Sequence, residues 1–120
     1  MKTILIVENN EELRDNTAEL LILAGYSTIV ASNGQQGFEY AKRIRPDVIL
    51  CDNTEAETSC SELLTQIRGD GDTADIPFIL FSENPVPEIK KIINNFSADG
   101  FIRKPFTEED LLDTIHEFVD

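Results

Sequence analysis

Residues 47–52 of the chain read Asp47-Val48-Ile49-Leu50-Cys51-Asp52, an apolar run that ends in a carboxylate. A short apolar run between polar residues is typical of a strand that is buried on both faces of a parallel sheet. In open sheets of this kind, ligands bind outside the carboxyl ends of the strands, close to the point where the strand order reverses. Asp52 is therefore the first candidate functional residue, although an aspartate at such a place also begins many turns.

The length and charge of the chain limit its class. We expect its 120 residues to form one domain, because they suffice for one core and are too few for two. Ten Lys and Arg residues stand against 23 Asp and Glu, so the net charge of -13 disfavours direct binding to nucleic acid or to an anionic membrane. No apolar run is long enough for a signal peptide or a membrane span, and we expect a cytoplasmic location.

The cysteines and the histidine do not form a recognisable metal motif. Cys51 and Cys60 are the two cysteines and His116 is the one histidine, a spacing that does not suit a zinc site. We interpret both cysteines as reduced thiols, with Cys51 in the core and Cys60 either buried or reactive. We expect His116 at the surface, near a helix end where its positive charge would suit the dipole.

Five apolar runs predict five strands. The runs at 4–7, 48–51 and 77–81 are continuously apolar and suit central strands. Residues 26–31 carry polar side chains and suit an exposed edge, and the run at 101–102 is short.

Helical periodicity follows each of these runs. Asn9 or Asn10 is expected to cap the first helix and Gly25 to end it, whereas Pro46 ends the second and residues 107–110 form a capping box for the fifth. The apolar positions of the five expected helices are Leu13, Leu20, Leu21 and Ala24; Phe38, Ala41 and Ile44; Leu63, Leu64 and Ile67; Ile89, Ile92, Ile93 and Phe96; and Leu111, Leu112, Ile115, Phe118 and Val119.

Strand and helix thus alternate five times, which predicts an α/β fold with a doubly wound, five-stranded parallel sheet and five helices, of flavodoxin-like type. Right-handed crossovers, with the polar second strand and the short fifth strand at the edges, favour the strand order 2-1-3-4-5. The strand order would then reverse between the first and third strands. Glu8 and Asn9 would face Asp52 across that crevice.

The carboxyl ends of four expected strands carry side chains with related chemistry, namely Glu8, Asp52, Ser82 and Lys104. Oxygen atoms from Glu8, Asn9 and Asp52 suit Mg²⁺, which takes one or two carboxylates and keeps several waters. An amine and a hydroxyl opposite the metal suit a phosphoryl group in transfer to a carboxylate. Asp52 is the expected acceptor.

These residues resemble the receiver domain of response regulators in two-component signal transduction, along the whole chain from Lys2 to Asp120. The resemblance rests on the acid after the first strand, Arg-Pro-Asp at 45–47, Asp52, Ser82 and Gly-Phe-Ile-Arg-Lys-Pro-Phe at 100–106. The intervals of 30 residues from Asp52 to Ser82 and of 22 from there to the lysine also match the family.

The resemblance implies a role for each matching residue. Asp52 would accept a phosphoryl group from a histidine kinase or a phosphotransfer protein, and Ser82 and Lys104 would bind the phosphoryl oxygens. Phe101 would be the switch aromatic. Mg²⁺ would be held by Glu8, Asn9, Asp52 and the backbone carbonyl of Thr54.

The resemblance also implies a signalling module rather than an enzyme. Such a module would meet a partner or an output domain through its fourth helix, fifth strand and fifth helix. The bond between Lys104 and Pro105 resembles the family's cis peptide.

Four residues depart from the family pattern. Asn9 replaces a second acid and should weaken Mg²⁺ binding, and Glu83 replaces a small residue and should repel an anionic donor. Ala56 stands in place of a proline and Cys60 in place of a glycine, so the loop after the acceptor is expected to have a different shape. These departures leave open a degenerate receiver that acts as a phosphorylation-independent interaction module.

A flavin-binding protein or a phosphatase on a similar sheet is the third possibility. Glu8, Glu11 and Glu12 would repel a phosphate cofactor from the loop after the first strand. Thr54 stands where a phosphatase of the aspartyl-phosphate type would have its second acid. Both observations disfavour this class.

Overall fold

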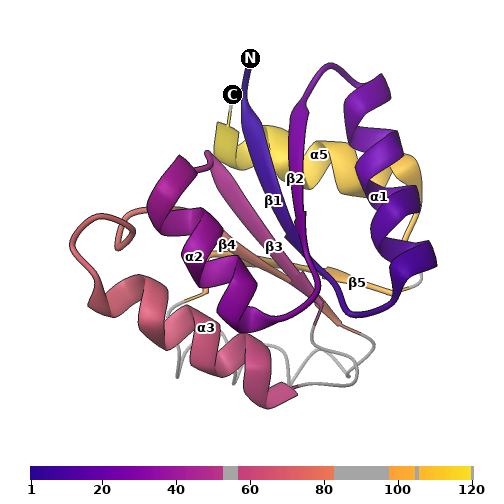
Figure 1. Cartoon of the computed structure of the whole chain (residues 1–120). Helices are drawn as coiled ribbons and strands as arrows, with labels where there is room; N and C mark the ends of the chain where they lie inside the picture. The colour runs from indigo at the N-terminus through magenta and orange to yellow at the C-terminus, as the bar shows by residue number, and fades with distance from the viewer. Residues whose placement is uncertain (53–56, 83–97, 105, 120) are drawn as a thin grey trace.

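The computed structural model describes residues 1–52, 57–82, 98–104 and 106–119, except for the side chains of residues 57–59 and 82. Strands and helices alternate along most of this part of the chain (Figure 1). The elements are β1 (Thr3–Val7), α1 (Glu11–Leu23), β2 (Ser27–Ala31), α2 (Gly34–Ile44), β3 (Val48–Asp52), α3 (Glu57–Gly69), β4 (Phe78–Ser82), β5 (Gly100–Arg103) and α5 (Glu108–Val119).

The strands form one parallel sheet in the order β2-β1-β3-β4-β5, which confirms the predicted topology. β1 and β3 are adjacent, so the strand order reverses between them, and their carboxyl ends meet at one edge of the sheet. Four of the five predicted helices lie in the described residues. The predicted fourth helix, around residues 89–96, lies outside them.

Each face of the sheet is covered by a layer of helices (Figure 1). Leu5 and Ile49 pack into one hydrophobic cluster with residues of α2 and α3. Their neighbours Ile4 and Leu50 pack into a second cluster with residues of α1 and α5. Successive side chains of a strand point to opposite faces, so a continuously apolar strand is what a sheet with two covered faces requires.

The ends of the helices follow from local side-chain chemistry. Asn10, rather than Asn9, caps α1, because its side chain accepts a hydrogen bond from the backbone N–H of Leu13 at 2.9 Å. The predicted capping box of α5 is confirmed by reciprocal hydrogen bonds between Thr107 and Asp110 at 3.2 and 3.0 Å.

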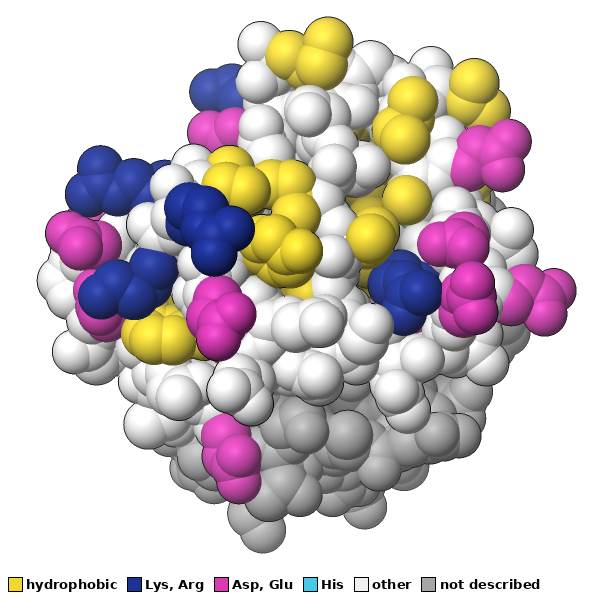
Figure 2. Space-filling view, in the orientation of Figure 1, with side chains coloured by type: hydrophobic (Ala, Val, Ile, Leu, Met, Phe, Trp, Pro, Cys, Tyr) yellow, Lys and Arg dark blue, Asp and Glu magenta, His cyan; other side chains and the backbone are white. Residues whose placement is uncertain are grey.

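The face in Figure 2 carries charged side chains around its edge and apolar side chains that adjoin one another near the middle of the view. Lys42 of α2 pairs with Asp70 at 2.8 Å. Leu23 at the end of α1 is 77% exposed, yet no helix in the described part of the chain is long and apolar enough to cross a membrane.

Candidate functional site

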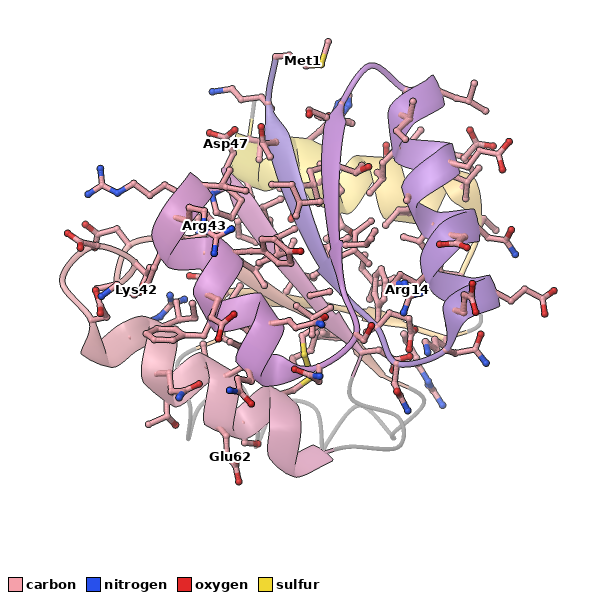
Figure 3. All side chains as sticks on the ribbon, viewed as in Figure 1. Met1, Arg14, Lys42, Arg43, Asp47 and Glu62 are labelled. Atoms are coloured by element: carbon pink, nitrogen blue, oxygen red, sulfur yellow. A yellow bond between two sulfur atoms is a disulfide. The ribbon has the colours of Figure 1, made fainter. Side chains whose placement is uncertain are left out.

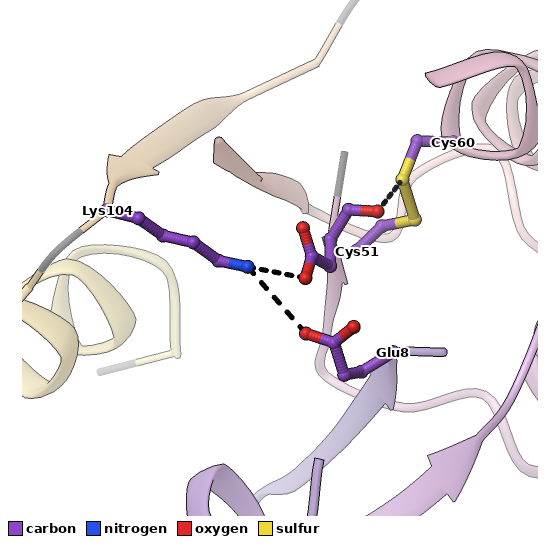
Figure 4. Close-up of a disulfide and its surroundings, with 5 residues drawn as sticks. Glu8, Cys51, Cys60 and Lys104 are labelled. Carbon is purple, nitrogen blue, oxygen red and sulfur yellow. Dashed lines mark hydrogen bonds and ion pairs between the residues drawn. A yellow bond between two sulfur atoms is a disulfide. The ribbon is translucent and has the colours of Figure 1, made fainter. Parts of the chain in front are cut away.

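Three charged side chains meet at the carboxyl edge of the sheet. Glu8 follows β1, Asp52 ends β3, and Lys104 follows β5. Lys104 Nζ lies 2.5 Å from Asp52 Oδ2 and 3.8 Å from Glu8 Oε1 (Figure 4). The exposed fractions of the three side chains are only 11% for Lys104, 7% for Asp52 and 5% for Glu8, so one ammonium group faces two carboxyl groups in a largely buried place.

Burial raises the pKa of Glu8 to about 7, and the contact with the Asp52 side chain acts in the same direction. The backbone N–H of Asn10, which donates to Glu8 Oε2 at 3.2 Å, and the charge of Lys104 lower this pKa and offset part of the effect. Glu8 therefore changes its protonation state close to neutral pH. Its other oxygen, Oε1, is buried and accepts no hydrogen bond from the residues that the structure describes.

Arg14 supports the turn that carries Glu8, and sequence analysis missed it. Its guanidinium donates to the backbone carbonyl of Glu8 at 3.3 Å and to Ser32 Oγ at 3.2 Å. Figure 3 shows the side chain leaving α1 beside β2. Arg14 thus connects the turn after β1 to the turn after β2. The sequence feature that could have indicated this role is that Arg14 is the one cation among residues 11–23.

The structure describes only some of the other predicted site residues. Asn9 is exposed beside the buried Glu8, and Phe101 is partly buried against the layer of α2 and α3. Ser82 ends β4 in register with Arg103, but its side chain lies outside the described part of the structure. Thr54, Ala56, Glu83 and Pro105 are also outside the described residues.

The interpretation of the cysteines as reduced thiols was wrong, because Cys51 and Cys60 form a disulfide (Figure 4). Their Cα atoms are 6.0 Å apart, a normal separation for a bridged pair. Both belong to the cluster between the sheet and the α2–α3 layer, Cys51 from β3 and Cys60 from α3. Cys60 Sγ also lies 3.1 Å from the backbone carbonyl oxygen of Asp52, so the bridge touches the candidate acceptor.

The residues present fit a hard cation better than a soft one. In the described ranges, no three His, Cys, Asp or Glu side chains gather into a metal-binding group. Mg²⁺ needs only one or two protein carboxylates, because it retains several waters. Glu8 and Asp52 meet that requirement, and the buried Glu8 Oε1 is an oxygen ligand without a hydrogen-bond donor among these residues.

Comparison with known sequences gives a consistent family. The family model for the response regulator receiver domain matches residues 4–116. The phosphate regulon transcriptional regulatory protein PhoB of Pseudomonas aeruginosa is 35% identical over 111 residues, which are 92% of this chain and 48% of PhoB. The polar-differentiation response regulator DivK of Brucella anthropi is 28% identical over 98% of this chain and 96% of DivK. The chain therefore spans about half of PhoB and nearly all of DivK.

Comparison with solved structures agrees with the family found by sequence. The chemotaxis protein CheY4 of Vibrio cholerae superposes with a TM-score of 0.91 at 26% identity, covering 98% of both chains. The receiver domain of the sensor histidine kinase PA1611 of Pseudomonas aeruginosa, described with a magnesium ion in its active site cleft, shares the fold with a TM-score of 0.88 at 22% identity, covering 98% of this chain and 97% of that one. The chain belongs to the family of response regulator receiver domains, the signalling modules of two-component systems.

Proposed function

We propose that residues 1–120 form one cytoplasmic receiver domain that accepts a phosphoryl group on Asp52 from a histidine kinase or a phosphotransfer protein. The observation that carries this proposal is the position of Asp52, at the carboxyl end of β3 and 2.5 Å from Lys104. A carboxylate at this edge of the sheet can meet a donor from outside, and the ammonium group is already beside it.

The chemistry requires one bond to form and one to break. A carboxylate oxygen of Asp52 attacks the phosphorus atom, and the bond from phosphorus to the donor nitrogen breaks with its electron pair on that nitrogen. The ammonium of Lys104 then holds a phosphoryl oxygen in place of the carboxylate oxygen that it contacts before transfer. Ser82 is the proposed second group for the phosphoryl oxygens.

Mg²⁺ is the proposed cofactor, with Glu8, Asn9, Asp52 and the backbone carbonyl of Thr54 as its protein ligands. The bound ion would offset the negative charge that gathers on the transferring group. Glu8 has to lose its proton to act as a ligand, and its pKa of about 7 makes that loss possible at neutral pH. Asn9 contributes no charge, so we propose that binding is weaker than with a carboxylate at this position.

We propose that the partner meets the domain through the predicted fourth helix, β5 and α5. A groove between β5 and α5 supports this choice, because it is lined by Phe101, Arg103 and Asp113 and also reaches Lys104. Phe101, the proposed switch aromatic, lies in the same strand that leads to Lys104. A change in the contacts of Lys104 at the acceptor would therefore reach this surface through β5.

The direct test is phosphorylation by a small acyl phosphate in the presence of Mg²⁺, followed by the mass of the intact protein. The wild type should gain one acid-labile phosphoryl group and Asp52→Asn none. Asp75→Asn is the matched control, because Asp75 is an exposed carboxylate in the segment before β4 and should leave the modification unchanged. Equal modification of Asp52→Asn and wild type would refute the assignment.

The alternative is a degenerate receiver that binds its partner without phosphorylation. Two features of the sequence favour it: Asn9 supplies no charge to the metal, and Glu83 places a negative charge directly after Ser82, where an anionic donor would approach. A protein that stays unmodified with saturating Mg²⁺, while wild type and Asp52→Asn bind the same partner equally, would support this alternative.

A further inference from the structure

The disulfide between Cys51 and Cys60 encloses the proposed acceptor in a short covalent ring. Cys51 is bonded to Asp52 through the peptide bond, and Cys60 lies in α3, nine positions after Cys51 in the sequence. Both cysteines are only 1% exposed, and they pack in the cluster between the sheet and the α2–α3 layer. Phosphoryl transfer as proposed above makes no use of either sulfur.

We propose that this cysteine pair is a redox modification site that sets the metal affinity and the phosphoryl acceptance of Asp52. The inference rests on the proposed function for its effect on phosphorylation, but the cysteine chemistry and its effect on Mg²⁺ binding can be measured separately. Two features support it, namely the direct bond from Cys51 to the acceptor and the contact of Cys60 with the acceptor's backbone.

Reduction changes what holds the backbone of Asp52. In the disulfide, Cys60 Sγ carries no proton, so its 3.1 Å approach to the Asp52 carbonyl oxygen is a packing contact. In the reduced protein the Cys60 thiol can donate only a weak hydrogen bond to that oxygen. Reduction therefore replaces a covalent connection between β3 and α3 with a weak contact at the acceptor residue itself.

The direction of the effect follows from the freedom of the backbone. With the bridge intact, Asp52 is the last residue of β3, and the bridge from the preceding Cys51 holds α3 to the same strand. The backbone around Asp52 then loses less conformational entropy when the side chain takes the position of a metal ligand. A site that is already ordered before binding has a higher affinity for its ligand. We therefore assign the higher Mg²⁺ affinity and the faster phosphorylation to the oxidised protein.

The redox step balances through thiol–disulfide exchange. The thiols of Cys51 and Cys60 lose two protons and two electrons as the sulfur–sulfur bond forms, and a low-molecular-weight disulfide takes them up and becomes two thiols. A dithiol reductant reverses the step through a mixed disulfide. Because both sulfurs are buried, exchange requires α3 to move locally away from β3 and should be slow. In the cytoplasm proposed above, disulfides are usually transient and often sense the redox state.

The test compares the full wild-type chain in two redox states. One sample is treated with dithiothreitol and the other with oxidised glutathione, the reagents are removed without air, and free thiols are counted by alkylation and intact mass. Mg²⁺ affinity is then measured by calorimetry, and the Mg²⁺-induced rise in melting temperature provides a second reading that needs no phosphorylation.

We expect two alkylated thiols in the reduced sample, none in the oxidised one, and Mg²⁺ affinity that is lower by about threefold or more after reduction. Cys60→Ala and Cys51→Ala should each bind Mg²⁺ like the reduced protein and should not respond to oxidation. The wild type is compared with itself, so the test remains valid if a variant fails to fold.

Two results would overturn the inference: two free thiols after oxidation, or equal Mg²⁺ affinity in the two redox states of the wild type. A redox effect on Mg²⁺ affinity without phosphorylation in either state would instead refute the proposed function, together with the effect of the cysteine pair on phosphorylation, and would leave the redox control of metal affinity standing. Asp52→Asn separates the two further, because the variant should still form the disulfide although it accepts no phosphoryl group.

Discussion

Lys104 Nζ lies 2.5 Å from Asp52 Oδ2, and both side chains are nine-tenths buried or close to it. Glu8 completes the cluster at 3.8 Å from the same nitrogen, so a single ammonium group compensates two carboxyl groups. A buried charge is costly without a partner, and the three side chains therefore depend on one another for stability as well as for the proposed chemistry.

Lys104→Met should destabilise the protein in a pH-dependent way. The substitution leaves Glu8 and Asp52 without their shared cation, and loss of one partner of a buried pair costs about 3 kcal/mol. The loss should be larger at pH 8 than at pH 5, because Glu8 is neutral at the lower pH. Denaturant unfolding at both pH values measures it. Arg103→Met, at an exposed neighbouring cation, is the control, and equal losses at both pH values would mean that Glu8 does not change its charge between them.

Wild-type stability, measured without metal, should fall as the pH rises from about 4.5 to about 7. The pKa of Glu8 is 4.5 for the unperturbed group and about 7 in the folded protein, so between these values the folded state holds a proton that the unfolded state has lost. Stability from this proton is fully present below 4.5 and is lost as the pH rises through 7.

Glu8→Gln tests this assignment, because the amide does not titrate. The variant should show a flatter dependence of unfolding free energy on pH over the same window, with Glu12→Gln, at an exposed glutamate of α1, as the matched control. If the slope of Glu8→Gln equals that of the wild type, another group is responsible for the pH dependence.

Much of the fold could be predicted from the sequence because local pattern and global topology agree. The part of a strand that is buried on both faces has to be apolar, and residues 4–7 of β1 and 48–51 of β3 are, so the central place of these strands followed directly. β2 is mostly half-buried, as its polar residues indicated for an edge. The meeting of Glu8, Asp52 and Lys104 followed in turn, because parallel strands carry their carboxyl ends to one edge.

The disulfide and the role of Arg14 could not be predicted in the same way. Whether two cysteines pair depends on the distance between their Cα atoms, which sequence spacing does not give. A partial signal existed for Cys60, which stands three residues before the inward-facing Leu63 and so lies on the same face of α3. Arg14 acts on backbone and hydroxyl oxygens across two turns, and no pattern of charges along the chain marks such contacts.

Asn9→Asp should raise the affinity for Mg²⁺. The added carboxylate lies next to Glu8 in the chain and supplies a full charge close to the cation, where Coulomb attraction is worth about 1 kcal/mol or more even at high dielectric. Calorimetric titration provides the affinity, and Asn33→Asp, at the cap of α2, is the control for added charge elsewhere. Unchanged affinity in Asn9→Asp would mean that Asn9 does not face the metal.

Glu83→Ala should accelerate phosphorylation by small anionic donors. Glu83 lies outside the described residues, so this prediction rests only on its place in the sequence, directly after Ser82. Removing a negative charge from the donor's route lowers the repulsion, and the gain should shrink at high salt, where an exposed charge is screened. The measurement is the phosphorylation rate of the wild type and of Glu83→Ala, with saturating Mg²⁺, at two salt concentrations. A gain that is the same at both concentrations would point to bulk rather than charge as the obstacle.

Asp52 itself is the proposed carrier of the phosphoryl group, and borohydride trapping identifies the carboxylate that is modified. Borohydride reduces an aspartyl phosphate to homoserine, which peptide mass spectrometry locates in the sequence. After treatment with an acyl phosphate and Mg²⁺, we predict homoserine at position 52 in the wild type and none in Asp52→Asn. Homoserine at another carboxylate position, or phosphorylation that leaves position 52 as aspartate, would mean that Asp52 is not the acceptor.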